Sequence, residues 1–281
     1  MLQIIGRRMW SKLNENFYQS RTSSYENLVK NNLRSSQNLA GWLQEFAPSE
    51  NFNLEFENQN QIKNLKSISF WNIEANSINY NDSLEYALKH RETTPVNQLH
   101  QGWSEAEILM LMNKAISDGS RGKDYQGVHI PLRNYPSGGA QFPIKLYMVS
   151  NTNAGFFKKN KSYEIHSDLG LISRVEDVDF KFEEVFAISH FNKKLYKQTS
   201  DVPFVVVMVM NLKHSFNKYS VYSQHLAMIE AGHIGQNLQL VSTALGNSSM
   251  PNGGILSDIT KEAIGLKNSI DDTVVYGVVF G

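Results

Sequence analysis

The distribution of hydrophobic and polar positions divides the chain near residue 80. Residues 1–80 are polar and irregular and rich in Asn, Ser and Gln, with helical spacing in 25–46 and short alternation in 51–56. Beyond this point apolar residues recur at regular helix or strand spacing. The pattern predicts an N-terminal accessory segment, residues 1–80, that packs on the main domain or on a partner, followed by a main domain over residues 81–281.

Three helices are predicted in the main domain. Asp82 is a candidate N-cap for a short helix. Ser104, followed three residues later by Glu107, has the spacing of a capping box and predicts the start of a second helix. Apolar residues near 3.6-residue spacing predict a long amphipathic helix over 222–245, in which His233 is expected to be a core residue.

Strands are predicted over residues 144–149, 202–210 and 273–280. The run 202–210 is continuously apolar and rich in valine, which is typical of a strand buried on both faces. Strands separated by long helices indicate an α+β or α/β domain.

Composition narrows the classes of function. The 281 residues include 27 Lys and Arg and 27 Asp and Glu, so no net charge favours nucleic acid or an anionic membrane. The longest apolar run is too short to span a bilayer, and the first residues lack a secretory signal, so a cytoplasmic protein is expected. The absence of cysteine excludes disulfides, thiol nucleophiles and cysteine-ligated metals, and no metal site is predicted.

Two glycine pairs are candidates for ligand contact. Gly138 and Gly139 follow Pro136-Ser137 just before a predicted strand, and Gly253-Gly254 follows the long helix. Adjacent glycines allow a flat ring or a phosphate to approach the backbone N–H groups closely. A tight turn is the alternative for the first pair.

Two glycines inside the long helix, Gly232 and Gly235, mark a face where another helix or a ligand comes close.

Lys218-Tyr219 lies between the buried strand and this helix. Adjacent side chains diverge on regular elements, so these two residues share one site only if they lie in a loop or at a helix start.

Arg91 and Thr93 follow the first short helix. An arginine beside a hydroxyl residue can hold a phosphate through its fork of N–H donors. A solvated arginine is the alternative.

In this order, over about residues 82–281, the motifs resemble one family: the FMN-dependent oxidoreductases of the nitroreductase fold, specifically the SagB-type (McbC-like) azoline dehydrogenases of thiazole/oxazole peptide synthetases. The resemblance rests on motifs in the family's order, namely Pro136-Ser137-Gly138-Gly139-Ala140 with Pro143, Lys218-Tyr219, Glu230-Ala231-Gly232-His233 with Gln236-Asn237, Gly253-Gly254 with Asp258, and Phe280-Gly281.

The resemblance implies an α+β fold with a central, mostly antiparallel sheet flanked by helices, and a homodimer that binds FMN at the subunit interface. It implies the following cofactor-binding residues: Arg91 and Thr93 at the phosphate, Pro136, Ser137, Gly138 and Gly139 against the flavin, Gln236 and Asn237 near it, and Gly253 and Gly254 along its edge. The family's phosphate motif carries a second arginine where this chain has Pro95, so Lys267 or a residue of the other subunit is expected to compensate.

The implied activity is oxidation of thiazoline or oxazoline rings in a ribosomally made peptide, as in thiazole/oxazole-modified microcins, within a complex that contains cyclodehydratase subunits. Lys218 and Tyr219 match the pair that the family uses in this reaction. Tyr219 is the candidate base; a free phenol ionises near pH 10, and a neighbouring cation such as Lys218 favours the phenolate. The alternatives are an NAD(P)H-dependent nitroreductase-like flavin reductase and a flavin-free scaffold subunit.

Overall fold

The structure, a computed structural model, describes part of the chain, namely residues 65–71, 73, 78–81, 83–99, 102–125, 128–185, 201–255 and 257–281. The chain divides into two units, Met1–Phe56 and Glu57–Gly281, and all described residues belong to the second. The helical spacing in 25–46, the alternation in 51–56 and the predicted cap Asp82 lie outside the described residues.

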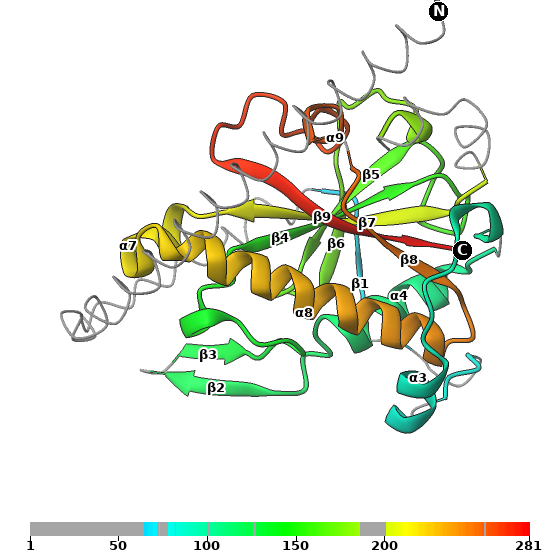
Figure 1. The fold of residues 1–281 in the computed structure, drawn as a ribbon, viewed down its shortest axis with the longest axis horizontal. Coiled ribbons are helices and arrows are strands. Elements are labelled where there is room, and N and C mark those ends of the chain that lie inside the picture. The colour runs from blue at the N-terminus through cyan, green and yellow to red at the C-terminus, as the bar shows by residue number, and fades with distance from the viewer. Residues whose placement is uncertain are drawn as a thin grey trace, which may run out of the picture. The chain divides into compact units, whose positions relative to one another are not determined.

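A seven-stranded antiparallel sheet forms the centre of the second unit (Figure 1). Its strands are β1 (Ser67–Ser69), β4 (Ile144–Ser150), β5 (Lys161–His166), β6 (Leu171–Arg174), β7 (Phe204–Asn211), β8 (Ser249–Asn252) and β9 (Asp272–Phe280). Their order is β1-β6-β5-β4-β7-β9-β8, and every neighbouring pair is antiparallel. A separate hairpin joins β2 (Gly122–Tyr125) and β3 (Val128–Pro131). The antiparallel α+β fold is therefore confirmed, and its first described strand comes from the segment before residue 80.

Helices flank this sheet. They are α3 (Leu84–His90), α4 (Glu105–Ala115), α7 (Lys213–Tyr219), α8 (Tyr222–Ala244) and α9 (Ser257–Ala263), with short 3-10 turns η2 (Val96–Gln98), η3 (Gly138–Ala140) and η4 (Phe182–Val185). The described cap of α3 is Ser83, whose side chain accepts from the Tyr86 N–H. Among the described helices, none is long and apolar enough to cross a membrane.

β7 is buried on both faces, as its continuous apolar sequence predicts. Val206 and Met208 face the core beneath α4 and α8, whereas Val205 and Val207 face a second core that η2, η4 and α9 cover. Alternate side chains of a strand point to opposite faces, so one strand supplies both cores. The sheet is therefore a layer with helices on each side.

The long helix α8 crosses one face of the sheet (Figure 1). A Cβ on Gly235 would lie 2.8 Å from the Tyr276 ring, so this glycine permits close approach of α8 to β9. Gly232 faces open space instead. The expectation of a core residue at His233 is wrong, because this side chain and that of Ile229 lie on the exposed face. The neighbouring Ile234 takes the buried position.

The capping box of α4 offers a test of the fold. The Ser104 side chain accepts from the Glu107 N–H, and the Glu107 carboxylate accepts from the Ser104 N–H at 2.8 Å. We expect Ser104→Ala to lower the free energy of unfolding by about 1 kcal/mol, because an N-terminal N–H of the helix loses its acceptor. Ser104→Thr, which keeps the hydroxyl, should recover most of this loss in urea denaturation. Equal losses in both variants would contradict the capping role.

Candidate functional site

The segment that carries the first glycine pair is a strained turn. Gly139, Ala140 and Phe142 have φ values of 57°, 55° and 47°, in the left-handed region. For residues other than glycine this region costs on the order of 1 kcal/mol or more, so the surrounding contacts must hold the turn. One such contact is internal: the Phe142 N–H donates to the Ser137 hydroxyl oxygen at 2.9 Å.

The end of α7 meets this turn. Lys218 Nζ donates to the Gly139 carbonyl oxygen at 3.5 Å, and the same nitrogen lies 5.4 Å from the centre of the Tyr219 ring. A Cβ on Gly139 would lie 2.1 Å from the Tyr219 hydroxyl oxygen, so only glycine fits between them. The structure therefore brings Gly139, Lys218 and Tyr219 together, although they are far apart in sequence.

Lys218 and Tyr219 lie at the end of a helix and not in a loop or at a helix start as expected. They form the last turn of α7, and the chain then reverses at Ser220 with φ 48°. Both side chains are long enough to converge on Gly139 from adjacent helical positions. The two side chains do meet at one place, but they do so from the end of a helix and not from a loop or a helix start.

α8 closes the other side of the turn. A Cβ on Gly138 would lie 3.0 Å from the Leu226 side chain. Glu230 lies one helical turn further along, and the Ser137 hydroxyl is among the groups that lower its pKa. Residues four apart share one face of a helix, so Leu226 and Glu230 form a single surface against the turn.

Glu230 is a buried acid within this surface. Its side chain is 1% exposed, and neither carboxylate oxygen completes a well-formed hydrogen bond with the described residues. Burial raises its pKa from 4.5 to about 7, against the lowering effects of the Ser137 hydroxyl, the Arg133 charge and the Ile144 backbone N–H. The sequence analysis quoted Glu230 only as part of a motif. Its helical spacing from Ala227 and Ile234, both core residues, was the signal that could have identified it.

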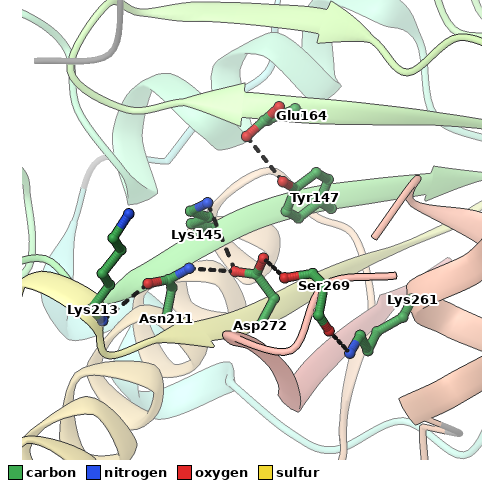
Figure 2. Close-up of polar contacts among 8 residues, drawn as sticks. All are labelled: Lys145, Tyr147, Glu164, Asn211, Lys213, Lys261, Ser269 and Asp272. Atoms are coloured by element: carbon green, nitrogen blue, oxygen red, sulfur yellow. Dashed lines mark hydrogen bonds and ion pairs between the residues drawn. The ribbon is translucent and has the colours of Figure 1, made fainter. Parts of the chain in front are cut away.

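A polar network around the buried Asp272 carboxylate fixes the beginning of α7 (Figure 2). The Asn211 side chain accepts from the Lys213 N–H at 3.1 Å and donates to Asp272 at 2.8 Å. The Ser269 hydroxyl donates to the other carboxylate oxygen of Asp272 at 2.6 Å, and Lys145 Nζ lies 3.7 Å from this carboxylate. The network therefore connects β4, β7 and β9 to the helix that carries Lys218 and Tyr219.

Of the remaining predicted residues, Arg91 contacts the second half of α8. Arg91 donates to the Gln239 side-chain oxygen at 3.3 Å. Thr93 is exposed. Gly253 is exposed and faces open space, and the Gly254 N–H donates to the Asn252 side chain at 2.6 Å.

The polar pair on α8 separates into two roles. Gln236 is exposed on the same face as Gly232. The Asn237 side-chain nitrogen donates to the Ala115 and Asn134 carbonyl oxygens at 3.2 and 2.9 Å. These bonds give Asn237 a structural role between α8 and the end of α4.

The predicted site residues thus form two groups in the single chain. At 1.5 Å per residue, Gln239, which binds Arg91, lies about 20 Å along α8 from Leu226, which contacts the turn. Lys267, the expected substitute for the second phosphate arginine, pairs with Glu262 at 2.5 Å in the loop after α9. Pro95 is exposed and precedes η2.

Several of these features suit a flat, phosphate-bearing cofactor. Gly253 and Gly232 present backbone with open space where a side chain would be. The positions beside Gly138 and Gly139 are filled by the Leu226 and Tyr219 side chains in the single chain, and Arg91 is a phosphate donor of the required chemistry. The open backbone at Gly232 and Gly253 and the Arg91 donor therefore fit a flavin mononucleotide, and the Gly138–Gly139 turn contacts Leu226 and Tyr219 instead.

Comparison with known proteins gives a family and a fold. The profile of the Nitroreductase family matches residues 101–281. No curated protein matches the sequence.

Solved structures share the fold at low sequence identity. A protein assigned to the nitroreductases from Ralstonia eutropha has a TM-score of 0.56 and 14% identity over 76% of this chain and 88% of that one. A chain of the E. coli microcin synthetase McbBCD complex, solved with truncated pro-MccB17 bound, has a TM-score of 0.54 and 18% identity over 85% and 80%. An Anabaena variabilis protein assigned to the nitroreductases has a TM-score of 0.53 and 18% identity over 77% of this chain, which spans 41% of that longer one.

The raised pKa of Glu230 predicts a pH dependence of stability. The unfolded chain releases this proton near pH 4.5 and the folded chain near pH 7, so the folded chain holds the extra proton between these values. The wild-type free energy of unfolding should therefore fall by about 3 kcal/mol across this window as pH rises. Glu230→Gln cannot acquire the charge and should lack this component in urea denaturation. The same pH dependence in both proteins would contradict the assignment.

Asp272 predicts a pH dependence of stability with the sign opposite to that of Glu230. Burial alone would raise its pKa, but the hydrogen bonds from Ser269 and Asn211 and the nearby lysine charges together lower it below 3.8. The contribution of Asp272 to the free energy of unfolding is therefore present above pH 3.8 and is lost as the pH falls further. Asp272→Asn should cost about 1–3 kcal/mol at neutral pH, because a carboxylate acceptor is lost. The exposed neighbour gives a control: Asp271→Asn should change the free energy of unfolding little, and an equal loss would exclude the network as the cause.

Proposed function

The chain belongs to the nitroreductase family, and we propose that it is an FMN-dependent azoline dehydrogenase that converts thiazoline or oxazoline rings of a ribosomally made peptide to thiazole or oxazole. The observation that carries this proposal is the convergence of Lys218 and Tyr219 on Gly139. A lysine and a tyrosine that meet at one point supply the cation and the proton acceptor that this oxidation requires.

The chain's own residues supply binding and proton transfer. Oxidation of an azoline removes two hydrogens from adjacent ring carbons, one as a proton and one as a hydride. Tyr219 is the proposed proton acceptor through its hydroxyl oxygen, and Lys218 places a cation 5.4 Å from the ring centre. The Gly139 carbonyl orients Lys218 through the bond at 3.5 Å. When bound, FMN would supply the hydride acceptor.

Two features support a homodimer as the active form. Arg91 contacts Gln239, about 20 Å along α8 from Leu226 at the glycine turn, so one chain keeps the predicted phosphate donor apart from this turn. The exposed face of α8 and the segment before it carry Val221, Met228 and Ile229 at 75%, 49% and 44% exposure. Covering this stripe with a second copy buries apolar area and brings a second set of groups to the same surface.

The proposed partners are an azoline-containing peptide and the cyclodehydratase subunits that form the azoline. The fold similarity to a chain of the E. coli microcin synthetase complex supports this choice, since that complex was solved with truncated pro-MccB17 bound. The substrate is the product of a dehydrating cyclisation, so a cyclising enzyme must act first.

The visible absorption spectrum of the purified protein and two variants test the proposal. The wild type should carry FMN and convert an azoline peptide to a product lighter by two hydrogens in mass spectrometry. Tyr219→Phe and Lys218→Ala should keep FMN and lose about 10²–10⁴-fold in turnover, because general acid–base help of this size is removed.

Asn217→Ala provides the matched control, because this exposed residue precedes the pair on α7. It should retain wild-type turnover and cofactor. A colourless wild type would favour the flavin-free scaffold, and rapid bleaching by NADPH without azoline oxidation would favour the reductase. Full turnover in both pair variants would remove Lys218 and Tyr219 from the mechanism.

A further inference from the structure

The end of α7 lies where a ligand of Gly139 would have to lie. A Cβ on Gly139 would overlap the Tyr219 hydroxyl oxygen and would be 2.8 Å from Lys218 Nζ. The sequence predicts close approach of a flat ring at this glycine, yet in the free chain the two side chains fill the space. A ligand can therefore reach the Gly139 backbone only after the end of α7 has moved.

The beginning of α7 is anchored, and little of the helix is buried. The Lys213 N–H donates to Asn211, which belongs to the network around Asp272 (Figure 2). Of the seven residues of α7 only Ser215 is buried, and its hydroxyl donates to the Leu212 carbonyl oxygen at the start of the same helix at 3.3 Å. A helix of this length has little stability of its own, so the contacts of its last turn decide whether that turn persists.

The chain leaves α7 through a strained residue. Ser220 has φ 48° and ψ −137°, close to the first central residue of a type II′ turn, a conformation that suits glycine and strains serine. The Ser220 N–H donates to the Phe216 carbonyl oxygen at 2.7 Å, and the Ser220 carbonyl oxygen accepts from the Ser223 hydroxyl at 2.6 Å. Ser223 is buried in α8. Because α8 fixes the carbonyl side of Ser220, its strain is relieved by the loss of bonds on the α7 side.

We propose that the last turn of α7 is a lid over Gly139, which Lys218 and Tyr219 hold closed in the free chain. The lid opens when this turn unwinds toward the anchored start of the helix, with Ser220 as the point about which the chain moves. The contacts at Gly139 stabilise the closed form, whereas the strain at Ser220 favours the open form. The inference rests on the proposed function for the identity of the ligand, whereas the lid is a property of the chain itself.

The lid makes Tyr219 and the ligand competitors for one place. Opening exposes the Gly139 backbone and in the same step releases the Tyr219 hydroxyl from it. The ligand binds the open form, so its apparent affinity is reduced by the fraction of the chain that is open. The contacts that hold Tyr219 on Gly139 therefore set how readily a ligand enters.

Hydrogen exchange of the purified full chain, freed of bound flavin and read by mass spectrometry on peptides that cover residues 216–220, tests the lid. Gly139→Ala should speed exchange there by about fivefold or more, the order expected for one lost hydrogen bond, because the added Cβ displaces Tyr219. Tyr219→Ala should have the same effect, and the double variant should exchange no faster than Tyr219→Ala alone. Ser220→Gly should slow exchange by about twofold to fivefold, because glycine relieves the strain of the closed form.

Gly246→Ala is the matched control for the alanine at Gly139. Gly246 has φ 77° and nothing within 4 Å of its Cβ position, so this variant places alanine in a left-handed backbone without displacing a neighbour. Its exchange in residues 216–220 should equal that of the wild type. Peptides of β7 report general loss of stability, which would raise exchange there as well. Wild-type exchange of residues 216–220 in Gly139→Ala, or an equal rise in Gly246→Ala, would overturn the lid, and faster exchange in Ser220→Gly would overturn the role of strain.

FMN as the probe ligand separates this inference from the proposed function. Its binding is measured independently, by the quenching of its fluorescence. Binding should speed exchange of residues 216–220 in the wild type, because a ring over Gly139 takes the place of the Tyr219 hydroxyl, and it should not do so in Tyr219→Ala. Bound FMN that leaves this exchange unchanged would overturn the lid as the entry to Gly139. If no FMN binds, the proposed function fails, and the variants of the free chain still decide whether the lid exists.

Discussion

The packing of α8 across the sheet is the constraint on which the rest of the structure depends. Its inner face combines core residues such as Ile234 with Gly235, where the absent side chain admits the Tyr276 ring. This close approach sets the position of Leu226 and Glu230 against the turn that contains Gly138. The candidate site is therefore built from the same face of the helix that forms the core, and a shift of α8 would move both.

Two buried acids show how local donors decide the behaviour of a charge. Asp272 has hydrogen bonds from Ser269 and Asn211 and nearby lysines, so its pKa falls despite burial. At Glu230 burial outweighs the lowering effects of Ser137, Arg133 and the Ile144 N–H, so its pKa rises to about 7. The first acid anchors the start of α7 as a permanent charge. The second lies beside the turn as a group that can change its charge near neutral pH.

Family membership and chemistry rest on different observations. The family match and the shared fold establish the scaffold, because residues 101–281 carry the family pattern over the sheet and its helices. The chemistry depends on a few side chains that low overall identity says little about. In the proposed function those are Lys218 and Tyr219, which reach Gly139 only because α7 ends where it does.

The sequence by itself determined the elements of the fold. Continuous valines predicted β7, helical spacing predicted α8, and Ser104 with Glu107 predicted the start of α4, because each signal is local and repeats at the period of its element. The glycine pairs and the Lys218-Tyr219 dipeptide were also visible as candidates. Only the tertiary structure decided which of them meet: contact between Gly139 and Tyr219 depends on how distant segments pack, and the burial of Glu230 and the exposure of His233 depend on which face of α8 meets the sheet. Helical spacing does not decide which of the adjacent residues His233 and Ile234 is buried. Packing against the sheet selects Ile234.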